Sequence, residues 1–377
     1  MVARKIPQIR TEPITDESAL PNRAHKGRGS VSNRTSGRFN MPDRYDIDDG
    51  WTVQENDALE RRKTILGIDS ARTIITRNSS PDIGFDRSIN PYKGCEHGCI
   101  YCFARPTHAY LDLSPGLDFE TRIFRKPDAP ALLRAELSNQ RYTPGPMVLG
   151  INTDAYQPTE RTEKLTRALL EVLYEFRHPV HIVTKSALIQ RDLDILGPMA
   201  AANLFSATLS VTTLDRHVAR VMEPRAATPS RRIDTIAILH KAGVPVSVLA
   251  APMIPGLTDH ELEAILTAAR EAGADRAGYN LVRLPWEIKT LFEEWLRENF
   301  PDRANKVLNH IRDVRGGKLN DPNFGSRMTG QGVYADLLKR RFEITVRKLG
   351  FNQYGREART GLDYSQFRGG DPQLSLF

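Results

Sequence analysis

Cys-Glu-His-Gly-Cys-Ile-Tyr-Cys, residues 95–102, contains all three cysteines of the 377-residue chain. An odd number of cysteines within eight positions cannot form a disulfide framework, so the C-x3-C-x2-C spacing predicts a metal site. Three thiolates suit three corners of an iron-sulfur cluster, which leaves the fourth iron open to an exogenous molecule. The alternative is a structural zinc site, which would need His97 or His108 as its fourth ligand.

Outward from this loop, short apolar runs alternate with segments of helical periodicity. Strands are expected at residues 85–92, 147–152, 180–185, 204–213, 244–253 and 277–284. Helices between them imply crossover connections and therefore a parallel sheet. The sequence thus predicts an α/β fold, a partial (β/α)6 TIM-like barrel, with its chemistry at the C-terminal ends of the strands.

Three helices are predicted in more detail. Apolar residues at helical spacing mark residues 165–176. Thr258 and Glu261 form a capping-box pattern before a helix that Gly273 closes. The last helix is expected at residues 333–349, where Gly350 ends it.

The composition, 40% hydrophobic and 26% charged residues, is that of an ordinary globular chain. The first ten residues contain no signal-peptide segment, and no apolar run is long enough to span a membrane, so a cytoplasmic location is expected. The net charge of +7 is concentrated at the ends. Residues 1–44 carry +5 and residues 339–377 carry +4, which leaves −2 for the rest. Affinity for nucleic acid would therefore lie mainly in these flanks, and solvated basic tails explain them equally well.

Four regions follow from these patterns. Polar and basic composition with few large apolar residues predicts a disordered N-terminal tail. The regions are a disordered basic tail (1–55), the partial barrel (56–320), a helical C-terminal extension (321–368) and a terminal peptide (369–377).

The cysteine loop resembles the signature of the radical S-adenosylmethionine (SAM) superfamily, in which an aromatic residue, here Tyr101, precedes the last cysteine. The resemblance implies a 4Fe-4S cluster on Cys95, Cys99 and Cys102, with the amino and carboxylate groups of SAM on the fourth iron. One-electron reduction then yields methionine and a 5'-deoxyadenosyl radical that abstracts hydrogen from the substrate. A flavodoxin or ferredoxin is the electron donor that the family implies.

The likeness extends over about residues 70–320. SPDIGFDRSINPY (80–92), NTDAYQP (152–158), TKS (184–186) and MEPR (222–225) resemble the spore-photoproduct-lyase-like branch. By position, the resemblance implies that SAM is held by Thr153, Asp154 and Lys185, with Tyr101, Ser210, Thr212, Glu223 and Arg225 as further candidates. A surface lysine and a helix-capping aspartate are the alternative interpretations of Lys185 and Asp154. The lyase itself uses an additional cysteine as hydrogen donor, and this chain has none, so that particular reaction is not expected.

The chain ends in Gln373-Leu-Ser-Leu-Phe377, which resembles the peptide by which bacterial polymerases and repair proteins bind the sliding clamp. Leu374, Leu376 and Phe377 would be apolar anchors, and Gln373 would form hydrogen bonds. A flexible polar segment precedes them in the sequence. In the alternative interpretation, these apolar residues pack against the protein's own surface.

These features together predict a radical SAM enzyme for DNA repair or nucleic-acid modification, recruited to the sliding clamp. Two other functions remain open at this stage. One is the same chemistry on a protein or small molecule, and the other is a non-catalytic metal-binding clamp adaptor.

Overall fold

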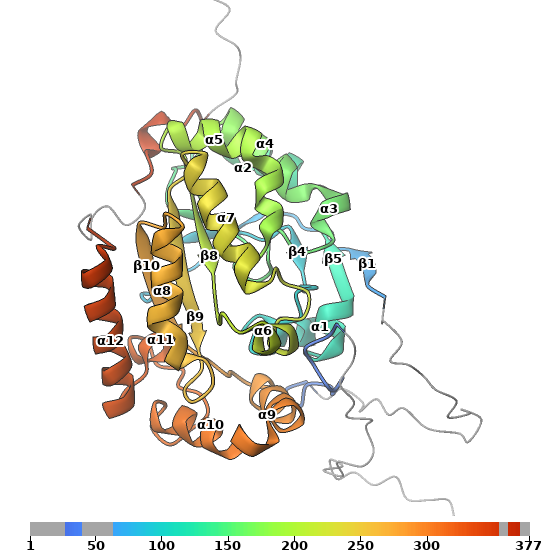
Figure 1. Ribbon diagram of the computed structural model, residues 1–377. Coiled ribbons are helices and arrows are strands. Elements are labelled where there is room, and N and C mark those ends of the chain that lie inside the picture. Colours follow the sequence, from blue (N-terminus) through green and yellow to red (C-terminus); the bar gives the residue numbers. More distant parts are fainter. Residues whose placement is uncertain (1–26, 40–62, 354–360, 370–377) are drawn as a thin grey trace, which may run out of the picture.

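The computed structural model describes residues 27–39, 63–353 and 361–369. Its main sheet has seven strands in the order β10-β9-β8-β7-β6-β3-β2 (Figure 1). The first six of these are parallel to their neighbours, and β2 pairs with β3 in the antiparallel sense. Their bounds are β2 Ile75–Arg77, β3 Arg87–Ile89, β6 Met147–Leu149, β7 Val180–Thr184, β8 Phe205–Ser210, β9 Val246–Met253 and β10 Arg276–Leu281.

Helices connect successive parallel strands and cover the outer face of the sheet (Figure 1). Those connecting β6 through β10 are α3 Glu160–Glu163, α4 Leu165–Glu175, η3 Ala187–Asp192, α5 Leu193–Ala201, α6 Arg216–Met222, α7 Pro229–Lys241, η4 Asp259–Glu261 and α8 Leu262–Glu271. Before β6 lie η2 Arg105–Leu111, α1 Leu117–Thr121 and α2 Ala129–Leu137. After β10 follow α9 Ile288–Asn299, α10 Pro301–Asp313, α11 Ser326–Thr329, α12 Val333–Leu349 and η6 Tyr364–Gln366.

All six predicted strands are confirmed, each within the expected residues or one residue beyond them. Six parallel strands with helical crossovers make the predicted partial (β/α)6 barrel, and the described strands leave it open, with β10 and β2 at its edges. The predicted helix at residues 333–349 is α12, and Gly350 ends it in the left-handed conformation with a φ of 71°.

The first predicted strand is divided between two sheets. Residues 87–89 form β3, whereas Tyr92–Lys93 form β4 in a second sheet with β1 Ile65–Ile68 and β5 Arg122–Arg125. Pro91 lies between them and has no N–H group for a ladder, which explains the break. The chain therefore leaves the main sheet just before Cys95.

Two apolar clusters hold these layers together. The larger fills the space between the main sheet and its helices, with Leu209 and Ile182 fully buried at its centre. The second joins the cysteine loop to α9 and α10 through Ile100, Met222 and Trp295. In Figure 1, α9 and α10 lie across the end of the sheet to which the arrow of β9 points. The cysteine loop is thus packed at the C-terminal edge of the parallel strands, as predicted.

The predicted capping box at residues 258–261 is wrong. The Glu261 carboxylate accepts hydrogen bonds from Thr213 Oγ1 at 2.5 Å and from the Leu214 amide at 2.6 Å. Thr258 Oγ1 accepts from the Ile254 amide at 3.0 Å. Both side chains therefore bond to other parts of the chain. These bonds replace the reciprocal bonds between Thr258 and Glu261 that a capping box would have.

The expected disorder of residues 1–55 does not hold for residues 27–39. Ser30 and Val31 are buried there, and the backbone bonds to α1 rather than to water. Composition failed as a guide because this segment is held by hydrogen bonds instead of apolar burial. Among the described residues, none of the helices combines the length and apolarity needed to cross a lipid bilayer.

Candidate metal centre and its polar surroundings

The cysteine loop turns at two glycines and is tied to distant parts of the chain. Gly94 and Gly98 have φ values of +82° and +68°, and a Cβ at either position would come within 3.0 Å of a neighbouring side chain. The Cys95 amide donates to Phe119 O at 3.0 Å, and the Ile100 amide donates to Met222 O at 3.1 Å. The path of the loop is therefore fixed by α1 on one side and α6 on the other.

The three cysteines are unpaired thiols, and two of them, Cys95 and Cys99, are buried. Burial raises the pKa of all three thiols, and the charges of Cys99 and Cys102 raise the pKa of Cys95 further. The Arg105 amide donates to Cys102 O at 3.2 Å, which closes the end of the loop. A cationic cluster would supply the charge that thiolates need in such a site, so this donor set fits a 4Fe-4S group.

A site for a single metal ion fits less well. Across residues 27–39, 63–353 and 361–369, no three His, Cys, Asp or Glu side chains converge as they would on one ion. His97 Nδ1 lies 3.3 Å from Asp154 Oδ2, and His108 Nε2 lies 2.9 Å from Arg122 O. Neither histidine completes a tetrahedral set with the cysteines, which argues against the zinc alternative.

A largely buried polar network is joined to the cysteine loop through Tyr101. The Tyr101 hydroxyl bonds to the Glu223 carboxylate and lies 3.2 Å from Thr212 Oγ1. Lys185 Nζ donates to Ser210 Oγ at 2.7 Å and lies 4.0 Å from Glu223 Oε1. These five residues, predicted from four separate stretches of sequence, therefore form one group.

Glu223 is the anionic centre of this network. Burial alone would raise its pKa, but the charges of Arg232 and Lys185 and the hydrogen bonds to the carboxylate lower it to about 2. The carboxylate is thus ionised at neutral pH. Because its folded pKa lies below the ordinary value of 4.5, its stabilising contribution is complete above pH 4.5 and is lost as the pH falls toward about 2.

Asp154 links the network to the metal loop. Its carboxylate accepts from Thr184 Oγ1 at 2.7 Å and from the Lys185 amide at 2.9 Å, besides facing His97. Burial would raise the pKa of Asp154, but His97 and these hydrogen bonds lower it to about 2. The carboxylate also accepts from the Tyr156 amide at 2.8 Å, but this bond closes a turn. The next helix, α3, begins only at Glu160, so Asp154 does not cap it.

Two predicted residues lie outside this network. Thr153 Oγ1 donates to Gly94 O at 2.7 Å and so holds the start of the cysteine loop. Arg225 pairs with Glu96 Oε1 at 2.9 Å and bonds to Thr64. Both residues contact the loop, but neither contacts Lys185 or Ser210 in the part of the chain that the structure describes.

Sequence reasoning missed two buried arginines. Arg232, from α7, pairs with Glu223 and donates to Ser210 O at 3.1 Å. Arg105 pairs with Glu120 at 2.5 Å and donates to the carbonyl oxygens of Cys99 and Gly98 at 2.8 and 3.0 Å. No short motif marks either residue, and their partners are recognised only in the folded chain.

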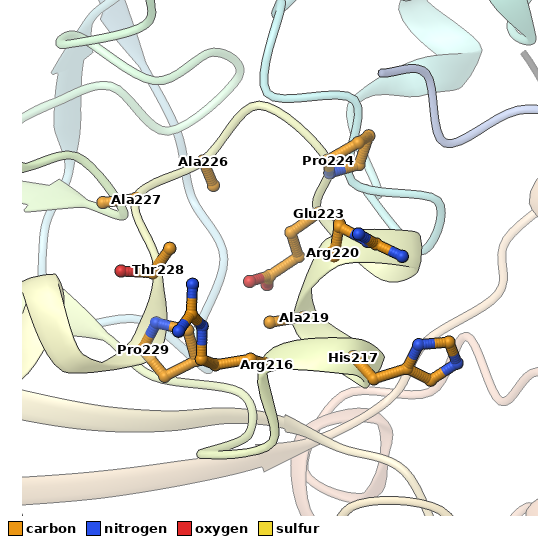
Figure 2. Close-up of a pocket in the computed structure, with 10 residues that line it drawn as sticks. All are labelled: Arg216, His217, Ala219, Arg220, Glu223, Pro224, Ala226, Ala227, Thr228 and Pro229. Carbon is orange, nitrogen blue, oxygen red and sulfur yellow. The ribbon is translucent and has the colours of Figure 1, made fainter. Parts of the chain in front are cut away.

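A cavity of about 350 Å³ opens between α6 and the start of α7. Figure 2 shows the Glu223 carboxylate and the Arg216 guanidinium directed into it from opposite sides. Arg216 and Arg220, one turn apart on α6, are exposed, and neither has an ion-pair partner among the described residues. The cavity therefore joins the buried network to an electropositive rim.

Residues 89–269 match the model of the radical SAM superfamily. An uncharacterized protein of Mycobacterium bovis is 34% identical over 224 residues, which are 59% of this chain and 66% of that protein. An uncharacterized protein of Methanocaldococcus jannaschii is 25% identical over 59% of this chain and 79% of its own length. The chain thus spans just under two thirds of the mycobacterial relative.

The fold is similar to that of a solved lyase. Spore photoproduct lyase complexed with dinucleoside spore photoproduct aligns with a TM-score of 0.53 and 15% identity, over 76% of this chain and 80% of that one. This likeness extends over more of the chain than the superfamily match at residues 89–269.

Replacing Arg232 by Met should lower the free energy of unfolding by about 3–5 kcal/mol, because it leaves the Glu223 carboxylate buried without its closest cation. The double variant Glu223→Gln/Arg232→Met should recover part of this loss. Urea unfolding at pH 7 measures both. A double variant no more stable than the single one would show that Arg232 acts through packing and its carbonyl bonds alone.

Proposed function

Because the chain belongs to the radical SAM superfamily, we propose that it is a cytoplasmic enzyme that repairs or modifies DNA and is recruited to the sliding clamp by its C-terminal peptide. The single observation that carries the catalytic part is the grouping of Lys185, Ser210 and Glu223 with Tyr101 of the cysteine loop. A 4Fe-4S cluster and SAM are the cofactors of the superfamily. When bound, they supply the reductive cleavage of the SAM sulfonium.

Cys95, Cys99 and Cys102 would hold the cluster, and the neighbouring polar groups would bind SAM. Lys185 is a cation 4.0 Å from Glu223, which lines the cavity, and it would pair with the SAM carboxylate by charge-assisted hydrogen bonds. The ionised Asp154 would accept hydrogen bonds from a ribose or an amino group. Glu223 and Arg232 neutralise each other, so they position Lys185 and Tyr101 without adding net charge.

Three observations support DNA as the substrate. The solved lyase of similar fold is complexed with dinucleoside spore photoproduct. The cavity rim carries two arginines with no partner among the described residues, which suits backbone phosphates. The net charge of the flanks is positive, as expected for a protein held near nucleic acid.

The clamp peptide, Gln373 to Phe377, lies outside the described residues, so it is argued from sequence. Tethering to the clamp would raise the effective concentration of enzyme at DNA without requiring a strong DNA site. An adaptor without catalysis would have no use for a half-buried cation, Lys185, in a polar network that includes Tyr101 of the cysteine loop. A flavodoxin or ferredoxin would supply electrons.

Anaerobically reconstituted protein, given dithionite and SAM, should release 5'-deoxyadenosine, as measured by liquid chromatography. Lys185→Met should retain the iron content but lose affinity for SAM by about tenfold or more, since a charge-assisted bond contributes about 1.5–3 kcal/mol. Fully loaded wild-type protein that releases no 5'-deoxyadenosine would rule out the catalytic proposal. Unchanged SAM affinity in the variant would remove the role of Lys185 alone.

Arg216→Ala/Arg220→Ala should weaken DNA binding and reduce the slope of log K against log salt by about 2, one unit for each lost phosphate contact. The matched control is Arg141→Ala/Lys241→Ala, which removes the same charge from exposed positions that precede β6 and β9, at the other end of the sheet. Titrations at several salt concentrations distinguish the two. Equal slopes in both variants would contradict a phosphate site at the cavity rim.

Phe377→Ala should abolish capture of the protein by purified sliding clamp, because it removes a terminal apolar anchor. Ser375→Ala, at a position the motif leaves free, should bind like wild type. Equal capture of wild type and Phe377→Ala would refute recruitment through this peptide.

A further inference from the structure

A polar segment near the N-terminus, residues 28–38, crosses the outside of the cysteine loop. We call it the strap. It lies outside the superfamily match at residues 89–269, yet Arg28, Ser30, Ser32 and Ser36 are buried in it. Segments of this composition normally stay in solvent, so the contacts that bury it need a specific partner.

The partner is a carboxylate that also holds the cysteine loop. The amides of Gly29 and Ser30 donate to the two Glu120 carboxylate oxygens at 2.9 and 2.8 Å. Arg105 pairs with the same carboxylate and donates to the carbonyl oxygens of the loop. Glu120 and Arg105 are completely buried, so strap, ion pair and metal loop form one continuous network without solvent.

The fit between strap and loop leaves no space. A Cβ on Gly29 would lie 1.9 Å from Gly98 O, the carbonyl between two metal-binding cysteines. A Cβ on Gly116, just before α1, would lie 2.2 Å from Ser32 O. Both obstacles are backbone atoms, which cannot move aside as a flexible side chain can.

The far end of the strap is fastened to α9. Ser32 Oγ donates to Glu294 at 2.7 Å, and Arg34 pairs with the same carboxylate at 3.0 Å. Arg38 pairs at 2.7 Å with Glu287, just before α9. The buried face of α9 packs in the same apolar cluster as Cys99 and Tyr101. Figure 1 shows this segment, in dark blue, running beside α1.

We propose that the strap is part of the cluster site, so that its docking and the retention of the cluster are coupled. The docked strap gives Glu120 two backbone donors and keeps Arg105 aimed at Gly98 O and Cys99 O. Displacing it exposes this network to water and frees the loop that carries the three thiols. Partners behind metal ligands typically change metal affinity by about 10- to 100-fold. Coupling is reciprocal, so loss of the cluster must loosen the strap.

The test uses three glycine variants of the full-length chain, reconstituted anaerobically. Gly29→Ala obstructs the strap at the loop, and Gly116→Ala obstructs it from α1. Gly37→Ala is the matched control, because it lies in the strap with no atom within 4 Å of the added Cβ. Iron loss to a ferrous chelator reports cluster retention. Trypsin cleavage after Arg34 and Arg38, followed by mass spectrometry, reports docking.

Both obstructed variants should lose iron about tenfold faster or more and be cleaved faster in the strap, whereas Gly37→Ala should match wild type. Wild-type protein stripped of its cluster should be cleaved faster than the loaded form. Faster cleavage with iron loss at the wild-type rate would overturn the coupling. So would faster iron loss with a protected strap. Circular dichroism shows whether Gly29→Ala folds. If it does not, Gly116→Ala and the comparison of loaded with stripped wild-type protein decide the question. Equal cleavage of the loaded and stripped proteins refutes the proposal.

Discussion

The rest of this structure depends on holding three thiols inside an eight-residue loop that is too short to satisfy its own backbone. Such a loop lacks the regular hydrogen bonds of a helix or a sheet. When it is buried, each amide or carbonyl that has no hydrogen-bond partner costs desolvation free energy. Distant elements supply the partners. Phe119 O and Met222 O accept from Cys95 and Ile100, and the Arg105 side chain donates to Gly98 O and Cys99 O. A fully buried arginine needs an anion in turn, and Glu120 is that anion. The path of the loop therefore depends on contacts with α1, with α6 and with the side chain of Arg105.

Buried charges beyond the loop are also paired with groups of opposite charge or with hydrogen-bond donors. Each buried carboxylate near the cysteines faces a cation or several donors: Glu223 faces Arg232, and Asp154 faces His97 and the Lys185 amide. Lys185 differs, because its nearest carboxylate, 4.0 Å away, is already paired more closely with Arg232. Its ammonium group is hydrogen-bonded to the neutral Ser210 and is not fully buried. It is therefore the cation of this network that is most available to an anionic ligand, which is why the proposed role in binding SAM falls on it.

Much of the fold could be predicted because it follows from local patterns, and part of the site could be predicted because its motifs resemble a known family. Alternating apolar runs and helical periodicity located six parallel strands, whose C-terminal ends meet at one edge. The resemblance then named Asp154, Lys185 and Ser210 as candidates at or near that edge. The strap, Arg105 and Arg232 could not be predicted in this way. Glu120 and Gly29 are 91 positions apart, and neither residue carries a pattern that names the other. The composition of the strap predicted disorder because composition indicates only how much apolar surface a segment can bury. This segment is instead held by hydrogen bonds to the Glu120 carboxylate.

The distribution of charge bears on the proposed action on DNA. The segment between the two flanks has a net charge of −2, and nearly all cations around the cysteines are paired internally. Arg216 and Arg220 would therefore be the main local attraction for phosphate at the cavity, and two contacts of this kind give weak, salt-sensitive binding. Weak local binding would let a substrate or product leave, but it would require another means of staying near DNA. The proposed clamp peptide would supply this by effective concentration, because the second contact becomes intramolecular once the first is made. Under this proposal, affinity would reside in the tail and selectivity in the cavity, so the two could change independently.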